Sequence, residues 1–100
     1  QEIIKVEEFV YSKIEFYLKD EESYCKWANS LMAKFVDYII QLQRFCEYKE
    51  KVKSILKQYR YSKIMLTAIY YAKNYSNLNG RIRARIIELE WYNFFRWYYR

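Results

Sequence analysis

Residues that break helices are almost absent from this chain: its 100 residues include no proline and one glycine, Gly80. Proline removes a backbone donor and glycine favours turns, so most chains use both residues where helices end. Apolar residues also recur at every third or fourth position, the spacing that places them on one face of an α-helix. Together these features predict an all-α protein made of long helices.

Four helical segments are predicted, and we expect them to pack as an antiparallel bundle in a single domain. The segments lie at about residues 2–19, 21–47, 50–75 and 80–99, and the domain spans residues 1–100. Asp20 precedes two glutamates and is predicted to cap the second helix, because a carboxylate accepts hydrogen bonds from the first free N–H groups. The stripe of the first helix is predicted to face the core through Ile3, Val6, Val10, Ile14 and Tyr17.

We predict a boundary between the second and third helices because a compact molecule of this size requires one. Polarity rises from Glu47 to Lys51 without any turn-forming residue, so one helix from Glu21 to about Tyr75 is the alternative. Such a helix would span roughly 80 Å and could not bury its stripe in a compact monomer. We therefore predict a turn there, although an elongated dimer would reverse this preference. Ser62 weakens the next segment and could mark a kink.

The clearest loop runs from Asn74 to Gly80, because asparagine and glycine tolerate turn conformations and asparagine can cap the following helix. Among the apolar positions, Leu31 and Leu66 are expected in the core, where a buried aspartate would unfold the protein.

Charge is unevenly distributed along the chain. The net charge is +6, but the first 22 residues are acidic and the remainder is strongly basic. A basic face is predicted that could bind an acidic protein surface or nucleic acid through phosphate contacts. Its residues are Lys49, Lys53, Lys57, Arg60, Arg81 and Arg85. The alternative is a solvated helix surface, which is common for lysine-rich helices, and no base-reading motif accompanies the face.

Aromatic residues make up 22% of the chain and gather at its C-terminal end. Rings on all sides of one helix cannot all face one core, so some are expected at an interface. The candidates are Trp91, Phe95, Trp97 and Tyr99. Self-association ranks first, other protein partners second and a membrane surface third. No transmembrane segment is expected, since no run of 18 apolar residues occurs.

The residue types disfavour catalysis. Histidine is absent, which excludes Ser-His-Asp and Cys-His machinery and the usual zinc hydrolase sites. Cys25 and Cys46 would lie roughly 30 Å apart on one helix, too far to bridge, and they supply too few ligands for zinc. We expect no catalytic residue, no metal and no cofactor. Unpaired thiols suit a soluble protein of a reducing compartment such as the cytoplasm.

In composition the chain resembles artificial helical bundles, which use few turn-specific residues; the resemblance covers the whole chain weakly and involves no motif. It implies a designed helical scaffold with an aromatic-rich core and no enzymatic activity. A fragment of a natural helical protein is the alternative, because designers rarely leave two cysteines and so little glycine at turns.

Overall fold

The computed structural model describes residues 2–98, and all its regular elements there are helical, which confirms the all-α prediction. Its elements are α1 (Glu2–Ile14), the 3₁₀ turn η1 (Glu15–Tyr17), α2 (Glu21–Phe45), α3 (Lys49–Arg60), α4 (Lys63–Tyr75), α5 (Leu78–Glu88) and α6 (Tyr92–Tyr98).

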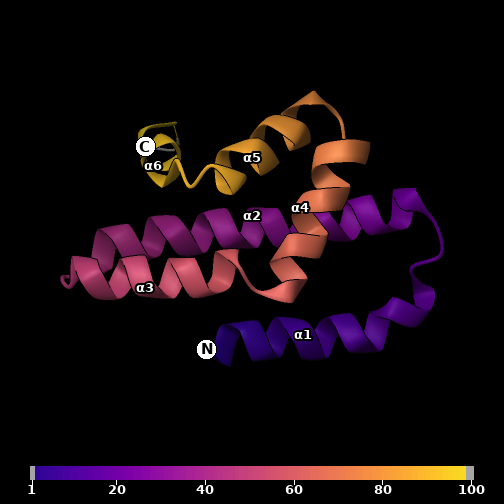
Figure 1. Ribbon diagram of the computed structural model, residues 1–100, viewed down its shortest axis with the longest axis horizontal. Coiled ribbons are helices and arrows are strands. Elements are labelled where there is room, and N and C mark those ends of the chain that lie inside the picture. Colours follow the sequence, from indigo (N-terminus) through magenta and orange to yellow (C-terminus); the bar gives the residue numbers. More distant parts are fainter. Residues whose placement is uncertain (1, 99–100) are drawn as a thin grey trace.

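The long helix α2 is the centre of the molecule (Figure 1). Helix α3 turns back antiparallel to it, and α4 crosses it and continues to α5 on the other side. Helix α4 makes its main contacts with α2 and α5, whereas α1 contacts α4 and lies at the opposite edge from α5 and α6. The radius of gyration over Cα atoms is 13.4 Å, close to the roughly 13 Å of a compact chain of this length.

The helix count differs from the prediction, because the described residues form six α-helices instead of four. The predicted turn near residues 47–51 is present, since α2 ends at Phe45 and α3 begins at Lys49. The third predicted segment is broken at Ser62, and the fourth is broken between α5 and α6. At the second break Glu90 has a φ of 58°, the left-handed conformation that ends a helix.

Side-chain caps explain where three of these helices begin. The Asp20 carboxylate accepts a hydrogen bond from the Ser23 N–H at 2.8 Å, as the sequence predicts. The Ser62 hydroxyl accepts one from the Met65 N–H at 3.3 Å and starts α4. Asn77 caps α5, so the predicted loop from Asn74 is shorter than expected, with only two residues between the helices.

The core lies between α2, α4 and the ends of α3, α5 and α6. Its largest buried side chains are Tyr59, Phe35, Phe95, Leu31, Met32, Ile39, Met65 and Ile87. The ring of Tyr59 packs at 4.5 Å from that of Phe35. Leu31 is buried as predicted, but Leu66 is 49% exposed, because Met65 and Ile69 take the inward positions of α4.

The orientation of α1 differs from the prediction. Val6 and Val10, expected in the core, are 57% and 38% exposed, whereas Glu7 is buried. The Glu7 carboxylate lies 3.4 Å from the Lys34 ammonium group, and the Tyr11 ring packs on Trp27 at 4.7 Å. These contacts to α2 place Glu7 and Tyr11 on the inward side of α1 and turn Val6 and Val10 outward.

Candidate functional site

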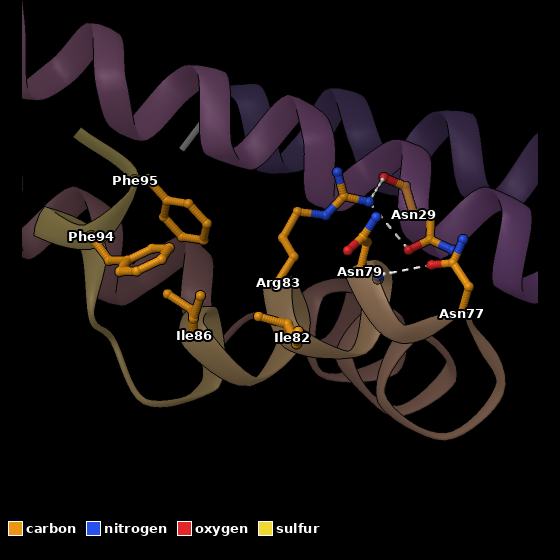
Figure 2. A pocket seen from close by; sticks show the side chains of 9 residues that line it. Asn29, Asn77, Asn79, Ile82, Arg83, Ile86, Phe94 and Phe95 are labelled. Atoms are coloured by element: carbon orange, nitrogen blue, oxygen red, sulfur yellow. Dashed lines mark hydrogen bonds between the residues drawn. The ribbon is translucent and has the colours of Figure 1, made fainter. Parts of the chain in front are cut away.

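A pocket of about 620 Å³ opens between α2, α5 and α6 (Figure 2). Its lining has a polar end and an apolar end, as Figure 2 shows. The lining residues are Asn29, Asn77, Asn79, Gly80, Ile82, Arg83, Ile86, Phe94 and Phe95.

Arg83 crosses from α5 to α2 at the polar end. Its Nη2 donates hydrogen bonds to the backbone oxygen of Asn29 at 3.1 Å and to the Asn29 side-chain oxygen at 3.2 Å. Asn29 is held in turn, because its amide nitrogen donates to the Cys25 sulfur at 3.3 Å. The Nε of Arg83 is buried and has no hydrogen-bond partner among residues 2–98. The guanidinium is therefore fixed in place with donor capacity left over.

Gly80 allows α5 to come this close to α2. A Cβ atom there would clash with the Ser76 hydroxyl and lie 2.8 Å from the side-chain oxygen of Asn29. The Asn77 side chain accepts a hydrogen bond from the Gly80 N–H at 2.9 Å and holds the first turn of α5. A Cβ at the single glycine of the chain would thus force the Ser76 and Asn29 side chains to shift.

The apolar end is formed by one face of α5 and the start of α6. Ile86 and Phe95 are buried, whereas Ile82 and Phe94 are 48% and 40% exposed at the rim. The Phe94 ring lies 6.0 Å from that of Trp97, which is 67% exposed.

The four predicted interface aromatics therefore differ in position. Phe95 is 2% exposed and belongs to the core and the pocket wall, which corrects its assignment to an exposed interface. Trp91, just before α6, and Trp97, within α6, are both exposed. Tyr99 lies outside the described residues.

Arg60 does not belong to the predicted basic face, because it is only 6% exposed. Its Nε donates to the Ile87 carbonyl at 3.2 Å and its Nη2 to the Glu88 carbonyl at 3.1 Å. The Ile87 carbonyl also accepts from the Glu90 N–H at 3.0 Å, so the guanidinium adds a charged donor at the C-terminal end of α5. Lys49, Lys53 and Lys57 do lie exposed along α3.

The two α5 arginines of that face make local contacts. The Arg81 Nε donates to the Ser76 carbonyl at 2.9 Å, and Arg85 forms an ion pair with Glu88. Glu88 also lies 2.8 Å from the Lys73 ammonium group. The hydrogen bond from Lys73, followed by the one from Arg85, lowers the pKa of the Glu88 carboxyl. The arginines of the predicted basic face thus have different partners: Arg60 and Arg81 donate to backbone carbonyls, and Arg85 pairs with Glu88.

The residues that line this pocket offer hydrogen-bond groups, one positive charge and apolar surface to a ligand. Arg83 is the one ionisable residue in its lining, so the lining contains no acid-base pair. Within residues 2–98 no cluster of three or more histidine, cysteine or acidic residues is placed to hold a metal ion. Cys25 and Cys46 are free thiols. No helix in this range has the length and apolarity needed to cross a membrane.

The pocket was not among the predicted sites. Its arginine is one of three in the α5 sequence, two of its amides (Asn77 and Asn79) lie in the predicted loop, and Asn29 lies in the predicted second helix. The sequence feature that could have indicated the pocket is Gly80, because a lone glycine in a chain without helix breakers indicates that two backbones approach closely. Comparisons with family models, curated proteins and solved structures gave no match to this chain.

Proposed function

We propose that this chain is a non-catalytic binding module whose pocket holds an apolar group with a carboxylate close to it. The observation that supports this function is the fixed guanidinium of Arg83 at one end of a cavity with apolar side chains at the other. A volume of about 620 Å³ is typical of small-ligand sites, which combine apolar walls with a few polar groups.

The charge of the pocket favours an anionic group. No acidic residue lines it, and the Asn29 contacts hold Arg83 in one orientation. Arginine matches carboxylates because its planar fork donates charge-assisted hydrogen bonds. An aromatic or branched aliphatic group beside the carboxylate would contact Ile82, Ile86 and Phe94.

The test is titration with 3-phenylpropionate and with the uncharged 3-phenylpropanol, followed by calorimetry and by NMR shifts of the pocket residues. We expect the acid to bind more tightly than the alcohol. Arg83→Gln should weaken binding of the acid by about ten- to a hundredfold, since a hydrogen bond to a charged group contributes roughly 1.5–3 kcal/mol, and should leave the alcohol unaffected.

Arg85→Gln is the matched control, because Arg85 lies on the same helix outside the pocket lining. It should leave both affinities unchanged. Absence of binding by both compounds, or shifts confined to residues outside the pocket, would contradict the proposed function.

A second candidate function uses the exposed lysines of α3. Lys49, Lys53 and Lys57 are spaced four residues apart and all are exposed, so they could contact an acidic protein surface or phosphates. Replacing all three by glutamate should abolish salt-sensitive binding to nucleic acid while the fold remains. A scaffold role and the resemblance to artificial bundles stay predictions.

A further inference from the structure

We infer that the group received by this pocket belongs to the outward face of α1 and η1 in a second copy of the chain, so that copies join head to tail. This inference rests on the proposed function of the pocket. We call that outward face the α1 stripe, and its residues are Val6, Phe9, Val10, Phe16 and Tyr17.

The α1 stripe is an uncovered apolar surface. Phe9, Phe16 and Tyr17 are 62%, 80% and 71% exposed, and the two valines extend the same side of the helix. The i, i+3, i+4 spacing of Val6, Phe9 and Val10 is that of a helix that inserts its apolar face into a partner. Contiguous exposed apolar side chains of this kind usually mark an interaction site.

The molecule cannot cover the stripe itself, because α1 is already oriented by its other side. Glu7 faces Lys34, and Tyr11 packs on Trp27, so both contacts hold the stripe away from α2. In Figure 1, α1 also lies at the edge of the molecule opposite to α5 and α6. The stripe of one copy and the pocket of the same copy therefore cannot meet.

The stripe carries the chemistry that the pocket is proposed to take. Glu8 and Glu15 are the sequence neighbours of Phe9 and Phe16 and are exposed like them, so each ring belongs to a segment that also carries an exposed carboxylate. Either ring could contact Ile82 and Phe94 while its neighbouring carboxylate approaches Arg83. An aromatic ring next to an acidic group is the pairing that the two ends of the pocket would recognise.

Charge complementarity favours a second copy as the occupant. Residues 1–22 contain seven acidic and three basic residues, a net charge of −4. Residues 78–98, which form α5 and α6, contain four arginines and two glutamates, a net charge of +2. Opposite charges bring the α1 stripe and the pocket together, whereas pairing of two α1 stripes would bring two acidic segments together.

A lipid surface suits the stripe less well. Interfacial helices that bind anionic lipids carry lysine and arginine along their polar face. Here Glu8 and Glu15 accompany Lys5 and Lys13, and Lys13 lies over the Phe9 ring at 5.2 Å instead of flanking the stripe. Because the two joined surfaces differ, a row of joined copies keeps a free stripe at one end and a free pocket at the other, and it grows until a ring closes.

The experiment uses two full-length variants that each lose one surface. Phe9→Ser with Phe16→Ser removes the rings of the stripe, and Ile82→Glu places a carboxylate at the pocket rim, where 48% exposure lets it fold. Tyr48→Ser is the control, because Tyr48 is 72% exposed in the α2–α3 connection, outside both surfaces. Helix content and thermal unfolding confirm that each variant folds.

Sedimentation velocity then measures association over a wide range of protein concentrations at low and moderate salt. We expect the native chain and Tyr48→Ser to associate, more weakly as salt increases, and each surface variant to lose association by about tenfold or more. An equimolar mixture of the two surface variants should form a 1:1 dimer that grows no further, because it contains one intact stripe and one intact pocket.

Three results would overturn the inference. One is a native chain that stays monomeric at all concentrations. Another is association that survives Ile82→Glu but not the stripe substitutions, which indicates pairing of two α1 stripes. The third is stripe-dependent binding to vesicles of anionic phospholipid without self-association. If 3-phenylpropionate still binds with Arg83 dependence in any of these cases, the proposed function stands and only the second copy is wrong.

Discussion

At the scale of single residues, Arg60 shows how a charged side chain can serve as the cap of a neighbouring helix. Its guanidinium contacts the last carbonyls of α5 and lies 4.6 Å from the centre of the Tyr61 ring. A positive charge at the C-terminal end of a helix also interacts favourably with the helix dipole. Arg60, the last residue of α3, therefore connects this helix to α5 through its side chain.

Arg60→Ala should lower the free energy of unfolding by about 2–4 kcal/mol, because two carbonyls lose a charged donor and the side chain leaves a space. Urea denaturation measures the loss. Lys57→Ala, one turn earlier and exposed, should change stability by less than about 0.5 kcal/mol. Equal effects of the two substitutions would show that the contacts of Arg60 do not stabilise the fold.

Gly80→Ala places two effects in opposition. Alanine is favoured over glycine inside a helix by about 1 kcal/mol. The added Cβ would, however, clash with Ser76 and Asn29, and an overpacked contact costs about 1–3 kcal/mol. We expect net destabilisation in thermal unfolding, whereas Asn79→Ala, exposed beside it, should have little effect. A stabilised Gly80→Ala protein would mean that α5 can move away from α2.

At the scale of elements, Ser62 turns one predicted helix into two. Its hydroxyl donates to the Tyr59 carbonyl at 2.7 Å and accepts from the Met65 N–H, so it satisfies the end of α3 and the start of α4. The chain changes direction there, which lets α4 cross α2 (Figure 1).

Ser62→Ala should reduce the free energy of unfolding by about 1 kcal/mol, the usual cost of losing a side-chain cap. Ser54→Ala, exposed within α3, should instead be neutral or stabilise by a few tenths of a kcal/mol, since alanine has the higher helix propensity. Chemical denaturation of both variants compares them directly. A shared sign of the two effects would argue against the capping role.

At the scale of the whole molecule, apolar periodicity predicted the fold class, the need for a compact molecule predicted the turn near residues 47–51, and the residue type predicted the cap at Asp20. The sequence indicated a kink at Ser62 but not a complete break, and it gave no sign of the break at Glu90, because neither position carries glycine or proline. It also assigned Val6 and Leu66 to the core, since periodicity finds an apolar face but not whether another helix covers it. The pocket could not be predicted either, because its position depends on how α2 and α5 pack against each other.

The buried Tyr59 and the partly buried Tyr11 make the stability of the molecule depend on pH above neutrality. Burial, with a smaller effect from Glu7, raises the pKa of Tyr59, and burial together with Tyr24 raises the pKa of Tyr11 to about 12. In the unfolded chain these groups lose their protons near pH 10. Their contribution to stability is therefore complete below about pH 10 and is lost as pH rises above it.

For Tyr59 the slope should approach about 1.4 kcal/mol per pH unit above pH 10. Urea denaturation between about pH 9 and pH 11 measures it, and Tyr59→Phe should have a shallower slope than the native chain. Tyr48→Phe, at an exposed position, should keep the native slope. Identical slopes for all three proteins would contradict a buried, protonated Tyr59.

The left-handed backbone of Glu90 has a consequence for the cavity beside α6. A non-glycine residue in this conformation costs roughly 1–2 kcal/mol, and here the Tyr61 hydroxyl donates to its carboxylate at 3.0 Å and fixes the joint. The direction of α6, and with it the position of Phe94 over the cavity, therefore depends on a single backbone torsion. A substitution that changes the backbone conformation at Glu90 would therefore alter the shape of the cavity opening while the core packing stays the same.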